Sequence, residues 1–126
     1  MHSVTSNAVA GLFKLLWSNN SPSSDFSAQS ISIPTMNDYS MLLVILNWAS
    51  YSQMAINSVL ISKGQSASQF NVMNYDNNGG IIFSATRNVT ISNNQINITD
   101  STLYVGVTKG STRNDICIPV RIYGIK

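Results

Sequence analysis

The stretch DICIPVRIYGIK, residues 115–126, decides the fold class, because its apolar side chains alternate along the chain. One face of this stretch carries Ile116, Ile118, Val120 and Ile122, and the other carries Cys117, Pro119, Arg121 and Tyr123. This period of two is typical of a half-buried β-strand. Pro119 has no backbone N–H to donate, so it predicts either an edge position or a local bulge.

Strand patterns continue toward the N-terminus from this stretch, with turn residues between them. Residues 39–49 are apolar on both faces, which predicts a strand that is central or covered by a second subunit. Residues 81–91 alternate, with Arg87 on the apolar face. The predicted strands are residues 26–33, 39–49, 54–61, 70–75, 81–91, 96–98, 103–107 and the closing stretch. About eight short strands predict an all-β fold, a β-sandwich of jelly-roll type or a squat barrel, and we expect the sandwich.

The N-terminal residues show helical rather than alternating spacing. Thr5, Ser6 and Asn7 offer N-cap side chains, which predicts a short helix over residues 6–17. This helix either lies on the sandwich or forms a seam between subunits. The predicted seam consists of Val4, Ala8, Leu12, Leu15 and Leu16. The expected organisation is a helical segment over residues 1–17, a polar connector over residues 18–25 and a sandwich domain over residues 26–126.

The chain carries very little charge. Charged residues make up 10% of the 126 residues, against about 25% in an average protein, and the formal net charge is +2. The cations form no basic run, so we expect no nucleic-acid partner. No apolar stretch approaches the length of a membrane helix, and no signal peptide is visible, so we expect no membrane insertion.

Catalytic and metal-binding motifs are not found in the sequence. The acids are five Asp residues with no Glu, and His2 is the single histidine, so we expect no enzyme activity. Cys117 is the single cysteine, which excludes an intrachain disulfide and a cysteine-cluster metal site. We expect this thiol to be a small core side chain, and we expect no metal and no cofactor.

Three polar segments combine aromatic, amide and carboxylate side chains, the chemistry that holds sugars. The predicted ligand-binding residues are Tyr75, Asp76, Asn77 and Asn78 in one turn, Arg113, Asn114 and Asp115 in a second, and Tyr51 near Trp48 in a third. The alternative for each segment is structural, since Asn-Asn-Gly-Gly is ordinary turn chemistry and Trp48 fits a core position.

Both ends of the chain resemble phage tail proteins. Residues 2–10, HSVTSNAVA, resemble the "VTSNAV" helical segment found in many phage tail-fibre and tail-tip proteins. Residues 117–126, CIPVRIYGIK, look like the close of small C-terminal domains of such proteins in phages and prophages of gut bacteria. The resemblance implies a homotrimeric distal domain, attached to the rest of a tail fibre, that contacts the host surface.

The function expected from this resemblance is non-catalytic adhesion to a bacterial cell-surface polysaccharide or glycan. The expected location is the virion tail, after synthesis in the bacterial cytoplasm. The alternative is a structural capping or assembly module of the fibre with no ligand of its own.

Overall fold

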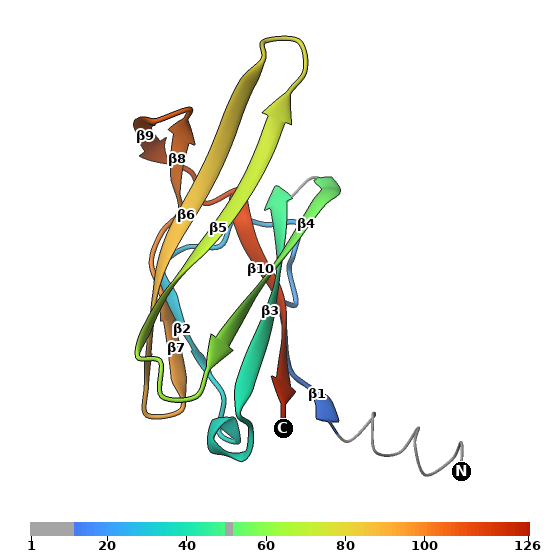
Figure 1. Cartoon of the computed structure of the whole chain (residues 1–126), viewed down its shortest axis with the longest axis vertical. Helices are drawn as coiled ribbons and strands as arrows, with labels where there is room; N and C mark the ends of the chain where they lie inside the picture. Colours follow the sequence, from blue (N-terminus) through green and yellow to red (C-terminus); the bar gives the residue numbers. More distant parts are fainter. Residues whose placement is uncertain (1–11, 50–51) are drawn as a thin grey trace, which may run out of the picture.

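The computed structural model describes residues 12–49 and 52–126 as two antiparallel sheets with an apolar core between them (Figure 1). Sheet A has the order β1–β10–β3–β4; in sheet B the path is β2–β7–β6–β8–β9, and β5 pairs with β6. The strands of sheet A are β1 (Phe13–Ser18), β10 (Ile116–Ile125), β3 (Met41–Ala49) and β4 (Ser52–Ser62). Those of sheet B are β2 (Gln29–Ser32), β7 (Gln95–Ile98), β6 (Ile81–Ser92), β5 (Ala67–Asp76), β8 (Thr102–Val105) and β9 (Thr108–Thr112). The prediction of an all-β sandwich is confirmed.

Strand β10 lies inside sheet A, between β1 and β3. The edge position predicted from Pro119 is therefore wrong, and the alternative, a bulge, is confirmed. The pairing of β10 with β3 shifts register between Pro119 and Arg121. From the other side, the Asn19 backbone N–H donates to the Val120 carbonyl (2.8 Å) and its Nδ2 donates to the Pro119 carbonyl (2.9 Å). A residue without a backbone N–H is tolerated at such an interruption of the ladder.

The predicted helix over residues 6–17 is wrong for residues 13–17, which belong to strand β1; residues 1–11 lie outside the described part of the chain. Strand β1 pairs antiparallel with β10, with Phe13 opposite Ile125. A register shift between Leu15 and Trp17 lets Leu16 and Trp17 both pack against the core. Because the bulge puts two consecutive apolar residues, Leu16 and Trp17, on the core side, the spacing of apolar residues in this strand resembles that of a helix. A helix of about a dozen residues is only marginally stable by itself in water. Pairing with the edge of β10 instead holds residues 13–18 as a strand.

The sequence predicts no strand between residues 107 and 115, and this is wrong for residues 108–112, which form strand β9. Lys109 pairs with Tyr104, and Thr112 with Thr102. A Cβ at Gly110 would lie 2.8 Å from the Leu103 carbonyl oxygen, so glycine permits the close approach of β8 and β9 here.

Strand β6 is the organising strand of sheet B. Along one edge it pairs with β5, from Ile81 opposite Asp76 to Thr90 opposite Ala67. Its other edge is divided: residues 83–86 pair with β8 and residues 89–92 pair with β7. The β5–β6 hairpin extends beyond the ends of β3 and β4 (Figure 1).

The largest fully buried side chain is that of Arg87, on the inner face of β6. Its guanidinium donates three hydrogen bonds to backbone carbonyls: Nε to Cys117 (2.7 Å), Nη1 to Thr99 (2.9 Å) and Nη2 to Ile116 (3.2 Å). The guanidinium carbon also lies 5.2 Å from the centre of the Phe26 ring, a cation–π distance. Burial lowers the pKa of Arg87, but an arginine pKa is so high that the group remains charged at neutral pH.

Cys117 is fully buried beside this arginine, which confirms the predicted core position of the thiol. Burial raises the pKa of the Cys117 thiol to about 11. The residue has a φ of 55°, in the left-handed region that non-glycine residues rarely adopt. Its carbonyl is one of the three that Arg87 binds.

None of the helical segments within residues 12–49 and 52–126 has the length and hydrophobicity needed to cross a membrane.

Arg87→Met is expected to lower the free energy of unfolding by about 3 kcal/mol or more, because three buried carbonyl oxygens lose their donor. Urea unfolding followed by tryptophan fluorescence measures this change. Lys109→Met, on exposed β9, is the control and is expected to change the free energy by less than about 0.5 kcal/mol. Equal stability of the two variants would show that the three carbonyls do not depend on Arg87.

The Cys117 thiol is expected to resist a thiol reagent in the folded protein at about pH 8 and to react on unfolding. Since the pKa of Cys117 is raised from 9.0 to about 11, its contribution to stability is complete below about pH 9 and is lost as the pH rises toward 11. Urea titrations across this range measure the loss. Cys117→Ala is expected to show a shallower decline, and an identical decline in both proteins would contradict the assignment.

Candidate functional site

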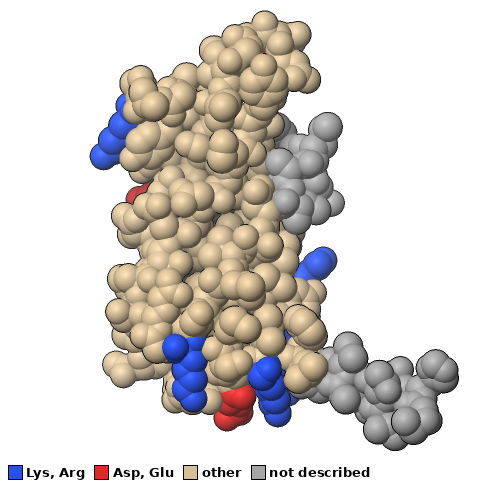
Figure 2. Space-filling view, in the orientation of Figure 1, with Lys and Arg blue, Asp and Glu red and all other residues tan. Residues whose placement is uncertain are grey.

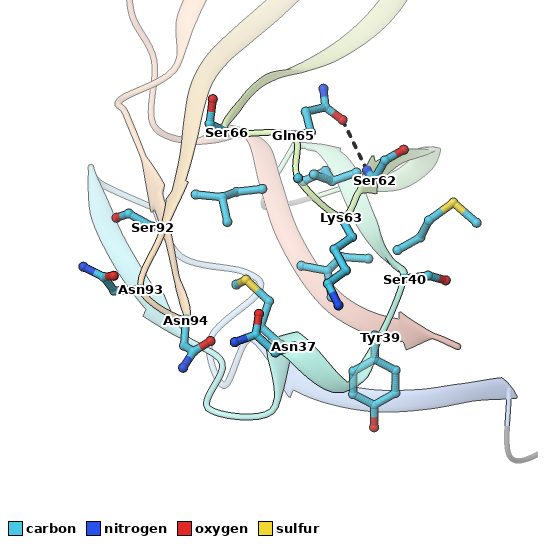
Figure 3. Close-up of a pocket in the computed structure, with 16 residues that line it drawn as sticks. Asn37, Tyr39, Ser40, Ser62, Lys63, Gln65, Ser66, Ser92, Asn93 and Asn94 are labelled. Carbon is cyan, nitrogen blue, oxygen red and sulfur yellow. Dashed lines mark hydrogen bonds between the residues drawn. The ribbon is translucent and has the colours of Figure 1, made fainter.

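Three turns at one end of the sandwich surround a pocket of about 480 Å³ (Figure 3). The first turn contains the short 3₁₀ helix Met36–Asp38 and leads into β3. The second, residues 63–66, joins β4 to β5, and the third, Asn93 and Asn94, joins β6 to β7. The pocket therefore lies where both sheets end, and each sheet contributes to its wall.

Backbone hydrogen bonds fix these turns to their neighbours. The Lys63 N–H donates to the Ser40 carbonyl (2.7 Å), which joins the second turn to the first. The Ile33 N–H donates to the Asn94 carbonyl (2.7 Å), which joins the third turn to the segment before the 3₁₀ helix. Asn93 and Asn94 have φ values of 47° and 63°, a conformation that asparagine tolerates better than most residues. The pocket is thus built on a hydrogen-bonded backbone frame.

The lining of the pocket is polar but almost uncharged. Amide side chains come from Asn37, Gln65, Asn93 and Asn94, and hydroxyls come from Ser40, Ser62, Ser66 and Ser92. The apolar part of the wall consists of Met36, Tyr39, Met41, Leu42, Ile61 and Ile91. Lys63 is the single charged residue of the lining, and in Figure 3 its side chain extends toward the segment that carries Asn37 and Tyr39. Amides and hydroxyls over an apolar wall can bind a neutral or anionic polyhydroxyl ligand.

Tyr39 lines the pocket but serves the fold. Its side chain is buried, and a Cβ at Gly124 would lie 2.6 Å from its ring. Glycine at position 124 therefore makes room for the ring against β10. Because the ring is buried in this contact, its face is not accessible for stacking on a ligand.

The predicted binding residues of the β5–β6 turn lie at the tip of the hairpin (Figure 1). Asp76 Oδ1 accepts a hydrogen bond from the Asn78 N–H (3.0 Å), and the Asp76 carbonyl accepts one from the Gly80 N–H (2.8 Å). These bonds are turn chemistry, so Asp76 has a structural role here. Tyr75 remains 57% exposed beside the polar turn. Asn77 is also exposed.

The second predicted cluster joins β9 to β10, at the level of the sandwich. Arg113 forms a bidentate ion pair with Asp115, with both N–O distances at 2.7 Å, and this bond lowers the pKa of Asp115. Asn114 Oδ1 accepts from the Ser101 N–H (3.0 Å), and its Nδ2 donates to Asp100 Oδ1 (3.0 Å). Asn114 is thus a structural residue that holds the start of β10 against residues 100–101.

Asp100 is the carboxylate partner in that network. Its Oδ1 also accepts a hydrogen bond from the Ala28 N–H (2.7 Å), which is the main cause of its lowered pKa, followed by the bond from Asn114. The Ser101 hydroxyl is buried beside this network and has no hydrogen-bond partner in the described structure.

The structure does not bring the predicted binding residues into the pocket. None of the seven described members, in residues 75–78 and 113–115, is part of its lining, and Tyr51 lies outside the described residues. Trp48 is half-buried and packs against the core, as its structural alternative predicted. Of the predicted seam, Val4 and Ala8 lie outside the described residues, Leu12 and Leu15 are exposed, and Leu16 packs against the core.

Sequence reasoning missed every polar residue of the pocket. The available signal was that Lys63-Gly64 and Asn93-Asn94 are turn sequences that flank predicted strands. Nothing in the sequence showed that these turns and residues 36–40 meet at one end of the sandwich. Within residues 12–49 and 52–126, no group of three or more His, Cys, Asp or Glu side chains is placed to hold a metal ion.

The chain matches no protein-family model, no curated protein and no solved structure, so the candidate site rests on its own geometry.

Asn114→Ala is expected to lower the free energy of unfolding by about 1–3 kcal/mol, because the Ser101 N–H and the Asp100 carboxylate each lose a hydrogen-bond partner. Asn78→Ala is the matched control. The hydrogen bond of that turn uses the Asn78 backbone N–H, which alanine keeps, so the expected change is below about 0.5 kcal/mol. Thermal and urea unfolding of the two variants measure both changes. A stable Asn114→Ala variant would return this residue to the candidate binding residues.

Proposed function

We propose that this protein is the distal adhesion domain of a phage-type tail protein and that it binds a bacterial cell-surface glycan without catalysis. The observation that carries the proposal is the pocket, where amides and hydroxyls line a cavity with an apolar wall. A sugar ring presents hydroxyls around its edge and C–H groups on its faces, so it matches both parts of this lining.

The charge of the lining narrows the ligand class. Lys63 supplies the one charge, and no carboxylate lines the pocket. A glycan that carries a carboxylate or phosphate substituent would gain a charge-assisted hydrogen bond from the Lys63 ammonium. Glycoside hydrolysis in its usual form needs two carboxyl groups across the scissile bond, and this lining provides neither. These features support adhesion rather than cleavage.

A structural module with no ligand is the second candidate, because a specific observation favours it. Four of the predicted binding residues use their side chains in bonds within the protein: Asp76, Arg113, Asn114 and Asp115. A capping module needs only such rigid turns. The exposed Tyr75 beside a polar turn favours adhesion instead, since a tyrosine face can stack on sugar C–H groups.

For the fold, we propose a jelly-roll variant. Pairings between strands distant in sequence, such as β10 with β3 and β2 with β7, support this topology. The resemblance at both ends of the chain supports a place in a virion tail, joined to the rest of a fibre and present in several copies.

Lys63→Ala is expected to weaken binding of the full chain to anionic glycans about tenfold, which corresponds to about 1.4 kcal/mol. The measurement is titration of fluorescently labelled protein against a bacterial glycan array. Lys109→Ala is the control, because it removes the same charge from exposed strand β9, outside the pocket lining.

Three results of this experiment have different meanings. Selective loss in Lys63→Ala supports the pocket. Equal loss of glycan binding in both lysine variants would show that only the net charge of the protein matters, and would contradict the pocket as the binding site. A third variant, Tyr75→Ala, is titrated in the same way. If it alone loses glycan binding and Lys63→Ala does not, the glycan site lies at the β5–β6 turn and not in the pocket.

A further inference from the structure

The outer face of sheet A is largely apolar on β1, β10 and β3, and Leu60 extends this apolar surface onto β4. Residues directly opposite each other in an antiparallel sheet share a face, so the register defines its rows. One row consists of Phe13, Ile125, Met41 and the polar Ser62, and the next consists of Leu15, Tyr123, Leu43 and Leu60. Phe13, Leu15 and Leu60 are 49%, 49% and 55% exposed, and the central residues of both rows are half-buried. The inner positions of β3, Leu42 and Val44, face the core, so β3 is apolar on both sides.

Part of the outer face of sheet B has the opposite character. Gln69, Asn71, Thr86 and Asn88 lie there, opposite the buried inner positions Phe70 and Val72. Their side chains form a hydrogen-bonded ladder, with Thr86 Oγ1 donating to Asn71 Oδ1 (2.7 Å) and Gln69 Nε2 donating to Asn88 Oδ1 (3.2 Å). This part of sheet B is therefore suited to face water, although Met73, Tyr75 and Ile82 are exposed on the same face further along the hairpin. On sheet A, by contrast, the apolar residues are contiguous across neighbouring strands.

The area of this face can be compared with the area that a specific protein–protein interface buries. Four strands about 4.8 Å apart and three alternate positions about 6.8 Å apart span roughly 400 Å² of flat area. This area, which includes Arg121, Ser58 and Ser62, is comparable to the largest apolar patch on a typical monomer, and such patches are often functional. Two copies packed through this face, with their polar margins, bury on the order of 1,000 Å², the lower limit for a specific interface.

We propose that the outer face of sheet A is the surface through which copies of this chain associate. The face carries one charged residue, Arg121, at its margin opposite Ile45, so it offers almost no charge for a charged partner to complement. A partner must present a flat, uncharged, apolar sheet, and this chain presents one itself. Two such sheets can pack about 10 Å apart, as the two sheets within a sandwich do.

This inference goes beyond glycan binding and does not depend on it: Met41 and Ser62, at one end of the face, also line the pocket, but Leu60 and Leu43 do not. It also replaces the predicted helical seam. Leu15 still takes part, but as a strand residue in the second row, while Leu16 faces the core.

The test is the mass of the full chain by light scattering after size exclusion, from about 1 to 100 µM. Wild type is expected at a multiple of 13.7 kDa. Leu60→Glu is expected to shift the protein to a single-chain mass, with at least a hundredfold weaker association, because it places an unpaired charge inside the contact. Met73→Glu is the matched control, since Met73 is an equally exposed apolar residue, at 58%, on β5 of sheet B.

Each outcome is decisive. A multimeric wild type and Met73→Glu variant with a monomeric, folded Leu60→Glu variant support the proposal; circular dichroism verifies the fold. A monomeric wild type at 100 µM would overturn it and leave the face to residues 1–11 or to a different protein. Dissociation by Met73→Glu instead of Leu60→Glu would overturn it by moving the interface to the β5–β6 hairpin. Glycan binding by the monomeric Leu60→Glu variant separates this result from that of the pocket.

Discussion

The guanidinium of Arg87 joins backbone segments that are far apart in the sequence. It binds the carbonyls of Thr99, Ile116 and Cys117, so one side chain on β6 holds the start of β10 and the β7–β8 connection together. Three neutral carbonyls rather than a carboxylate receive this buried cation, with Phe26 against it. The left-handed backbone of Cys117 costs on the order of 1 kcal/mol or more, and its hydrogen bond to Arg87 offsets that cost. The position of β10, and through it of sheet A, depends on this arrangement.

Alternation in the sequence was sufficient to predict most strands and the inward direction of Arg87, because a period of two fixes which face each side chain occupies. It was insufficient for β1. The apolar residues around Leu15 and Leu16 have helical spacing only because a bulge interrupts the strand, and the bulge depends on the register with β10. Gly110 is similar: it reads as a turn residue, but its role is the close approach to Leu103. The first error came from a pairing partner distant in the sequence, and the second from a short hairpin whose two strands approach closely.

The candidate site was harder to predict than the fold for a related reason. Asp76 and Asn114 have the side chains that bind sugars, yet the folded chain uses them in its own turns. The pocket instead forms from three ordinary turns whose common position follows from the topology of the two sheets. The surface has few charged side chains, so amides and hydroxyls are the main groups that it offers to a ligand (Figure 2).

The proposed interface and the proposed pocket constrain each other geometrically. The pocket lies at one end of the strands, whereas the apolar face of sheet A lies along their side. A rotation axis parallel to the long axis of the sandwich would bring sheet A faces inward and place every pocket at the same end of the assembly. A two-fold axis perpendicular to the long axis would place the pockets at opposite ends. Individual sugar sites are weak, and several sites directed at one surface gain avidity without any new contact. Under the proposed adhesion function, the parallel arrangement is the one that directs every pocket at the same surface.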